Sequence, residues 1–234
     1  MDTPTRVAVI TGASQGIGAG LVRGYRDLGY AVVANSRTIG AGDDPQVLAV
    51  AGDIARPGTG RRIIDAAIER FGRIDTVVNN AGIFIAKPFT DYTDADYEAI
   101  TGVNLRGFFE VTRAALAVMG TGGHVVNIST SLVDQANSQA PSALASLTKG
   151  GLNAATKALA VEYAGRGIRV NAVALGVIST PMHDPSTHET LAGLNPMGRI
   201  GEVDEVVEAV LYLERAGFVT GDILHVDGGQ SAGH

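Results

Sequence analysis

The sequence contains no cysteine. This absence excludes disulfide bonds, thiolate metal sites and a cysteine nucleophile, and it is compatible with a reducing cytoplasm. Basic residues are also few, because 18 Lys and Arg stand against 24 Asp and Glu and the formal net charge is −6. A chain without a basic surface is not expected to bind nucleic acid.

Long apolar runs are missing as well, since no stretch approaches the roughly 18 apolar residues that span a bilayer. The first residues, "MDTPTRVAVITG", lead directly into a predicted strand without the charged and apolar regions of a signal peptide. We therefore expect a soluble, cytoplasmic protein without a membrane partner. His, Asp and Glu are not clustered at the spacing of metal ligands, so no metal site is predicted.

What the chain does contain is a regular alternation of two kinds of segment. Short apolar, β-branched runs alternate with segments of helical periodicity, which indicates a parallel sheet covered by helices on both faces. No break in composition divides the 234 residues, so we expect a single domain over residues 1–234. The predicted strands are 6–11, 31–36, 47–53, 74–82, 123–129, 168–175 and 222–228, and the predicted helices are 16–29, 59–71, 94–118, 142–164 and 203–215.

The predicted fold class is therefore α/β, a doubly wound parallel sheet of about seven strands of the Rossmann type. Such sheets bind ligands at the carboxyl ends of their strands. The segment "TIGAGDDPQV" (38–47) is too short and too rich in Gly and Pro for a full crossover helix, and we predict a loop or a single turn there. An irregular segment at about 181–198 is expected to form a lid over the substrate.

A glycine-rich segment, "TGASQGIG" (11–18), follows the first strand and opens the first helix. Glycines there allow a tight turn and a close approach of the backbone to a pyrophosphate at the positive end of the helix. The spacing of Gly12, Gly16 and Gly18 resembles the T-G-x-x-x-G-x-G fingerprint of the short-chain dehydrogenase/reductase family. Four further segments are similar to motifs of this family in the same order, namely "NNAG" (79–82), "VNLRG" (103–107), "RVNAVALG" (169–176) and "ILHVDGG" (223–229).

The resemblance implies an oxidoreductase with a nicotinamide dinucleotide cofactor. Folds that prefer NAD place a carboxylate at the end of the second strand, where this chain has Ser36 and Arg37, which can donate to a 2′-phosphate. We therefore predict NADP(H), with NAD(H) as the alternative because Gln15 stands where many NADP-preferring relatives carry a basic residue. Asp53 matches the residue that contacts adenine in the family, and a helix N-cap is its alternative role. The residues expected to hold the cofactor are Gly12, Ser14, Gln15, Gly16, Ile17, Gly18, Ser36, Arg37, Asp53, Ile54, Asn80, Ala81, Gly82, Lys149, Val177, Ile178 and Thr180.

The catalytic residues are carried over from the same resemblance. In the family, a Tyr is the general acid/base, a Lys four residues later lowers the pKa of this Tyr and holds the nicotinamide ribose, and an Asn supports a water relay. Here Asn104 and Lys149 match the Asn and the Lys. A hydroxyl after the fifth strand bonds the substrate oxygen in the family. Thr130 matches that position by alignment, but the segment up to the Lys is about two residues longer than usual, so Ser131 is the alternative.

The Tyr itself is absent, because Ala145 occupies its position and no Tyr lies between Tyr97 and Tyr163. The enoyl-reductase branch of the family carries its Tyr seven residues before the Lys, where this chain has Ser142. An alkyl hydroxyl such as that of Ser142 or Ser146 has a much higher pKa than a phenol, so it can relay a proton but hardly originate one. A methyl group at position 145 is expected to leave space for a water or a larger substrate.

Three outcomes follow from the missing Tyr. In the first, a water or the Lys149 ammonium supplies the proton. In the second, His183 or His188 in the lid segment supplies it, since imidazole has a suitable pKa. In the third outcome the protein binds NADP(H) without efficient turnover and acts as a sensor or a partner subunit. The helices at 94–118 and 142–164 carry a second apolar face that suits a four-helix subunit interface, which predicts a homotetramer or a dimer. The expected partner is a small-molecule substrate.

Overall fold

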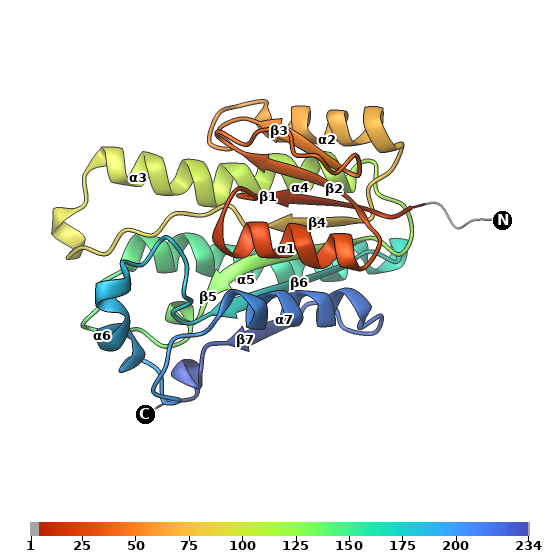
Figure 1. Cartoon of the computed structure of the whole chain (residues 1–234). Helices are drawn as coiled ribbons and strands as arrows, with labels where there is room; N and C mark the ends of the chain where they lie inside the picture. The colour runs from red at the N-terminus through yellow and green to blue at the C-terminus, as the bar shows by residue number, and fades with distance from the viewer. Residues whose placement is uncertain (1–4, 234) are drawn as a thin grey trace.

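The computed structural model describes residues 5–233, and its centre is one sheet of seven strands (Figure 1). The strand order is β3-β2-β1-β4-β5-β6-β7, and all neighbouring strands are parallel. The predicted doubly wound sheet is thus confirmed, while residues 1–4 and 234 of the predicted domain lie outside the described residues. The strands are β1 (Val7–Thr11), β2 (Ala31–Ser36), β3 (Val47–Ala51), β4 (Thr76–Asn79), β5 (His124–Thr130), β6 (Arg169–Leu175) and β7 (Ile223–Val226).

Helices cover both faces of this sheet and create two separate cores. On one face, α1 (Gly16–Asp27) and α7 (Val203–Arg215) pack on the sheet through side chains such as Leu21 and Val210. On the other face, α2 (Thr59–Phe71), α4 (Phe108–Leu116) and α5 (Ala143–Tyr163) form the second core, with Ile63 and Val111 fully buried. Central strands buried on both sides need apolar residues at successive positions, which explains their continuous apolar runs.

The predicted helix 94–118 is interrupted in the structure. It consists of α3 (Asp94–Thr101), a π-helical segment η2 (Gly102–Gly107) and α4. Glycines at both ends of η2 allow close packing, since a Cβ at Gly107 would lie 2.8 Å from Ile54 Cγ1. A widened π turn is often found at functional sites because it turns side chains away from their helical register.

The segments predicted to be irregular differ from each other. Residues 38–46 contain no helix or strand, as expected from their glycines and proline. The lid segment 181–198 is partly helical, with a 3₁₀ turn η5 (Pro185–Thr187) followed by the short helix α6 (His188–Ala192). The remaining short 3₁₀ turns are η1 (Phe89–Asp91), η3 (Ser131–Val133), η4 (Ala164–Arg166) and η6 (Gln230–Ala232).

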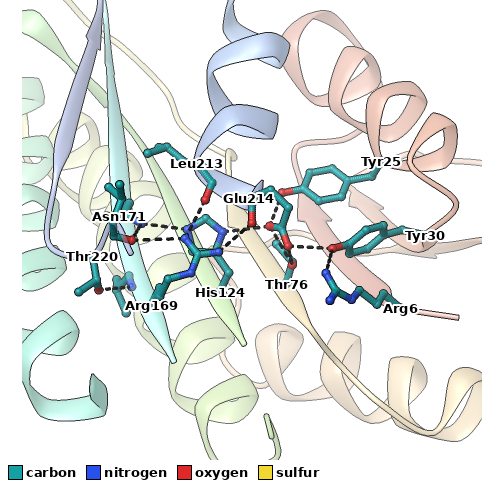
Figure 2. A network of polar contacts seen from close by, with 12 residues as sticks. Arg6, Tyr25, Tyr30, Thr76, His124, Arg169, Asn171, Leu213, Glu214 and Thr220 are labelled. Atoms are coloured by element: carbon teal, nitrogen blue, oxygen red, sulfur yellow. Dashed lines mark hydrogen bonds and ion pairs between the residues drawn. The ribbon is translucent and has the colours of Figure 1, made fainter. Parts of the chain in front are cut away.

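A buried carboxylate, that of Glu214 on α7, lies at the amino-terminal end of the sheet (Figure 2). Its side chain is 6% exposed and accepts hydrogen bonds from the Tyr30 hydroxyl at 2.8 Å, the Thr76 hydroxyl at 3.0 Å and His124 Nδ1 at 2.9 Å. The Tyr25 hydroxyl donates a further bond at 3.1 Å. Burial raises the pKa of Glu214, but these hydrogen bonds outweigh it and lower the pKa to about 2.

The neighbouring imidazole of His124 is held in its neutral form. Asn171 Nδ2 lies 3.1 Å from His124 Nε2 and also donates to the Val219 carbonyl, while Asn171 Oδ1 accepts from the Asp222 amide, so the Asn171 amide group has one orientation. The Nε2 atom of His124 is therefore an acceptor, and its Nδ1–H donates to Glu214. Burial lowers the pKa of His124 below its ordinary value.

These two groups predict an acid-sensitive fold. Both folded-state pKa values lie below those of the unfolded chain, so the unfolded chain binds more protons in acid and the free energy of unfolding falls. We expect this decrease to begin below about pH 6.5, where His124 titrates in the unfolded chain, and to continue below about pH 4.5, where Glu214 does. Urea unfolding between pH 8 and pH 4 measures it, and a free energy of unfolding independent of pH would contradict the interpretation.

The substitution Glu214→Gln should lower the free energy of unfolding at pH 7.5 by about 3 kcal/mol, because it leaves buried donors without their charged acceptor. Glu208→Gln, on an exposed position of the same helix, is the matched control and should change stability by less than about 0.5 kcal/mol. Equal effects of the two substitutions would show that the buried carboxylate does not stabilise the fold.

Candidate functional site

A cavity of about 620 Å³ lies at the carboxyl ends of the strands. Its wall contains every residue that the sequence predicted to hold the cofactor, although these residues come from the ends of five different strands and from helix α5. The cavity lies next to the β1–β4 boundary, where the strand order reverses, which is the usual ligand position in a doubly wound sheet. The structure thus brings the predicted cofactor residues together, and their binding role remains a prediction.

The glycine loop begins where β1 ends, and its backbone geometry requires glycine. Gly12 has a φ of +67°, and a Cβ at Gly18 would lie only 2.1 Å from the Gly12 carbonyl oxygen. The side chain of Asn80 holds the loop by donating to the Thr11 and Gly12 carbonyl oxygens. Gln15, the N-cap of α1, makes no side-chain capping bond, so the first amides of this 12-residue helix are free of a side-chain cap and suited to an anion.

The end of β2 carries two hydrogen-bond donors, Ser36 and Arg37, and no carboxylate. The hydroxyl of Ser36 is buried and has no hydrogen-bond partner among the described residues, and the exposed Arg37 follows it on the cavity wall. Asp53, after β3, also lies on the wall and accepts from the Ala55 amide at 3.0 Å. An unpaired hydroxyl beside a guanidinium fits a phosphate or a ribose hydroxyl, so the residues present fit a dinucleotide at this end.

Lys149 projects from α5 to the end of β5. Its ammonium group donates to the Ile128 carbonyl oxygen at 2.6 Å, and burial lowers its pKa to about 8. Gly82 lies opposite, where a Cβ would be 3.0 Å from Lys149 Nζ and 3.5 Å from Asn104 Oδ1. The glycine of the "NNAG" segment therefore allows the ammonium group to lie close to the backbone that follows β4.

Asn104 lies in the π-helical segment and is 1% exposed. Its Oδ1 accepts from the Ile83 amide at 3.0 Å, and its Nδ2 donates to the Ile83 carbonyl and to Thr148 Oγ1, both at 3.1 Å. The side chain does not belong to the described cavity wall. In this geometry Asn104 holds the segment after β4 against α5, and its predicted part in a water relay remains a prediction.

The structure distinguishes the two candidate hydroxyls after β5. Thr130 lies on the cavity wall, where its Oγ1 donates to the Leu175 carbonyl at 3.3 Å and accepts from the Leu132 amide. Ser131 is fully buried, with its Oγ 3.1 Å from the Leu175 carbonyl oxygen and 3.0 Å from Gln230 Oε1. Only the first of the two adjoins the described cavity, so the geometry favours Thr130 as the group that contacts a substrate oxygen.

Ala145 forms part of the wall one helical turn before Lys149, and its residue is only 2% exposed. The expected space for a water or a larger substrate beside its methyl group remains a prediction. The longer connection before α5 supplies Leu132, Asn137 and Ala140 to the same wall. The described wall residues include no tyrosine, and they include neither Ser142 nor Ser146. Ser146 Oγ donates to the Leu132 carbonyl instead.

The two histidines of the lid are placed differently. His183 lies on the cavity wall, whereas His188 does not, and His188 Nε2 is buried without a partner among the described residues. Burial, together with the nearby His188, lowers the pKa of His183. Lys149 and His183 are consequently the described wall groups whose protonation changes closest to neutral pH.

Apart from Ala145, the lid segment 181–198 and the predicted cofactor residues, the apolar wall residues were not predicted from the sequence. They are small or apolar residues in loops and helix ends, and such residues look like ordinary core or surface positions until the chain is folded. We call the following set the apolar end of the cavity: Ile83, Phe84, Val103, Leu132, Ala140, Ala145, Met182, Leu191 and Leu194. Gln230, from η6 near the carboxyl terminus, was also missed.

Two further observations concern residues 5–233 as a whole. No three His, Asp or Glu side chains of this range are grouped so that they could hold a metal ion. No helix of the same range has the length and apolar character needed to cross a bilayer.

Comparison with known proteins places the chain in a family. The family model described as "Enoyl-(Acyl carrier protein) reductase" matches residues 12–231. The chain is 38% identical to the granaticin polyketide synthase putative ketoacyl reductase 2 of Streptomyces violaceoruber over 240 residues. This alignment covers 95% of each of the two sequences.

Solved structures with the same fold carry nicotinamide cofactors. A blue fluorescent protein from a metagenomic library, in complex with NADPH, superposes with a TM-score of 0.88 at 32% identity and covers 96% of this chain and 97% of its own. The 3-ketoacyl-(acyl-carrier-protein) reductase of Brucella melitensis, complexed with NADH, gives a TM-score of 0.87 at 32% identity over 97% and 98% of the two chains. Because the family model and these relatives match almost the full length, the chain belongs to the short-chain dehydrogenase/reductase family of oxidoreductases.

Proposed function

We propose that the protein transfers hydride between NADP(H) and a carbonyl or alcohol substrate, with a proton donor other than tyrosine. The observation that carries this proposal is one cavity in which the glycine loop, Ser36, Arg37, Thr130 and Lys149 all face the same space. The residues that would hold the cofactor and the Thr130 hydroxyl, which would contact the substrate oxygen, support this proposal by lying on one wall.

The residues on the wall suit each part of the cofactor. When bound, the nicotinamide ring supplies or accepts the hydride. The glycine loop and the first turn of α1 suit the pyrophosphate, Lys149 suits the ribose hydroxyls, and the backbone near Val177 suits the carboxamide. The related structures contain NADPH or NADH, so they do not decide between the two cofactors. Ser36 and Arg37 favour NADP(H), because neither side chain repels a 2′-phosphate and both can donate to it.

A proton must reach the oxygen atom when the carbonyl is reduced, and two wall residues are suited to supply it. The Lys149 ammonium, with a pKa of about 8, is close enough to neutrality to exchange protons with a water in the cavity. His183 is the second candidate, since it also lies on the wall. The Thr130 hydroxyl can orient the oxygen but is too weak an acid to protonate it unaided.

The second candidate function is binding of NADP(H) with little turnover. It is favoured by the nearly covered methyl group of Ala145, because no group as acidic as a phenol takes that place on the described wall. A sensor or a partner subunit would use the same cofactor contacts. We also propose a homo-oligomer, a dimer or tetramer, on the basis of exposed apolar side chains on α4 and α5 such as Phe109 and Val161.

The cofactor preference is tested by Arg37→Ala. Losing charge-assisted hydrogen bonds to a 2′-phosphate should weaken NADPH binding by roughly 10- to 100-fold and leave NADH binding unchanged. Fluorescence titration of both cofactors gives the two dissociation constants. Arg61→Ala, on an exposed position of α2, is the control, and an equal loss for NADPH and NADH in Arg37→Ala would contradict the proposed 2′-phosphate contact.

The enzyme and the binding protein are separated by Lys149→Ala and Ala145→Tyr. For an enzyme, NADPH oxidation with a panel of ketones, imines and quinones should be measurable in the wild type and fall by about 100-fold or more in Lys149→Ala. Tight NADPH binding with no wild-type turnover, together with activity gained in Ala145→Tyr, would instead support the binding protein.

The pH dependence identifies the proton donor. A general acid must be protonated, so kcat/KM for reduction should fall as pH rises through its pKa, which is about 8 if Lys149 is the acid. If His183 is the acid, the decrease comes at a pH below the usual imidazole value, because the pKa of His183 is lowered. In that case His183→Asn removes the titration, whereas His188→Asn, outside the described wall, keeps it but moves it to higher pH, because the nearby His188 no longer lowers the pKa of His183.

A further inference from the structure

The apolar end of the cavity has few groups that could pair with a polar substrate. Four of the described wall residues carry an ionisable side chain: Arg37, Asp53, Lys149 and His183. The first two follow β2 and β3, on one side of the sheet, whereas the apolar end follows β4, β5 and β6 on the other side. The arginine and the aspartate therefore serve the nucleotide side, and no carboxylate or guanidinium of the described wall belongs to the apolar end.

Several of the remaining polar atoms near the apolar end already have partners within the protein. Lys149 Nζ donates to the Ile128 carbonyl oxygen, and Asn137 Oδ1 accepts from the Gln139 amide at 2.8 Å. Gln230 Oε1 lies 3.0 Å from Ser131 Oγ. A substrate with several hydroxyl groups or a carboxylate would lose its hydration here and regain few hydrogen bonds, which is unfavourable.

Three separate chain segments close this end, and each brings apolar side chains to it. Ile83 and Phe84 follow β4, Leu132 and Ala140 follow β5, and the lid contributes Leu191 with its neighbours. The first two segments are joined because the Lys87 amide donates to the Pro141 carbonyl at 2.9 Å. The base of the lid lies against the glycine loop, since a Cβ at Gly16 would be 3.4 Å from the Thr180 side chain.

We infer that the substrate is an uncharged ketone, or the corresponding secondary alcohol, whose body is hydrocarbon and packs against the apolar end of the cavity. This inference rests on the proposed hydride transfer. In the reduction, the carbonyl carbon gains a hydride from the reduced cofactor and the oxygen gains a proton from the protein or from water, which yields the alcohol and the oxidised cofactor. Polyhydroxylated sugars and oxo acids should be poor substrates, because they would lose hydration at the apolar end and find few hydrogen-bond partners there.

Ala145 contributes to this selection by its small size. It lies one helical turn from Lys149 and on the same helix face, so a larger side chain there would limit how closely the hydrocarbon body approaches the ammonium group. A phenyl ring at this position would occupy part of the apolar end without adding an acid. Size at position 145 therefore determines specificity independently of proton supply.

Three ketones built on one ring test the substrate class: 4-methylcyclohexanone, 4-oxocyclohexanecarboxylate and 2-keto-myo-inositol. We expect kcat/KM for NADPH oxidation with 4-methylcyclohexanone to be at least 30-fold higher than with the other two. Calorimetric titration of the same ketones into the protein–NADP⁺ complex, in which no reduction occurs, should give the same order of affinity. Equal or higher values for the carboxylate or the inositol derivative in either measurement would overturn the inference.

The two measurements separate this inference from the proposed function. Preferred binding of 4-methylcyclohexanone without turnover of any ketone would support the apolar site and contradict hydride transfer as the function. Turnover of the charged or hydroxylated ketone would support hydride transfer and overturn the apolar substrate. Absence of binding by all three ketones would overturn the inference.

Two substitutions locate the selectivity in the apolar end. Leu191→Asn, a change of similar volume, should lower the preference for 4-methylcyclohexanone over the carboxylate by at least 5-fold, while the dissociation constant of NADPH stays unchanged. Leu147→Asn, which exchanges an exposed leucine of α5 outside the described wall, should alter neither quantity. Ala145→Phe should reduce kcat/KM for 2-decalone at least 10-fold more than for 4-methylcyclohexanone, and an unchanged ratio would overturn the role of position 145.

Discussion

The organisation of this protein depends on the common direction of its seven strands. Because all neighbouring strands are parallel, their carboxyl ends meet at one edge of the sheet, and the loops that leave them converge there. The glycine loop after β1, Ser36 and Arg37 after β2, Asp53 after β3 and Gly82 after β4 reach one cavity for this reason alone. Residues far apart in the chain become neighbours without any contact that is specific to them.

The two edges of the sheet carry different chemistry. At the amino-terminal edge, the ionised Glu214 is enclosed by donors from α1, β4 and β5, so its carboxylate oxygens are hydrogen-bonded and the group serves stability. At the carboxyl-terminal edge, Ser36 and the amides that begin α1 are left without side-chain partners. Polar groups satisfied within the protein hold a fold together, whereas unsatisfied ones in a cavity are available to a ligand.

The active-site helix shows how one position changes the chemistry of a retained scaffold. Lys149 keeps its place beside Gly82 and the end of β5, while Ala145, one turn earlier, adds only a methyl group to the wall. The residues proposed to hold the cofactor therefore keep their places on the wall whatever side chain stands at position 145. In the proposed function, position 145 bears on the source of the proton and on the space next to the substrate, which are separate properties.

The sequence by itself determined the strand–helix alternation, the seven-stranded sheet and the set of residues predicted to hold the cofactor, because these follow from local periodicity and from spacings within single loops. Only the tertiary structure decided that Thr130 rather than Ser131 adjoins the cavity, that Asn104 bonds Ile83 and Thr148 from a π-helical turn, and that His183 lines the wall while His188 does not. It also decided the pairing of Glu214 with His124 and the residues of the apolar end. These features depend on the direction of side chains and on contacts between segments distant in the chain, which no local spacing encodes.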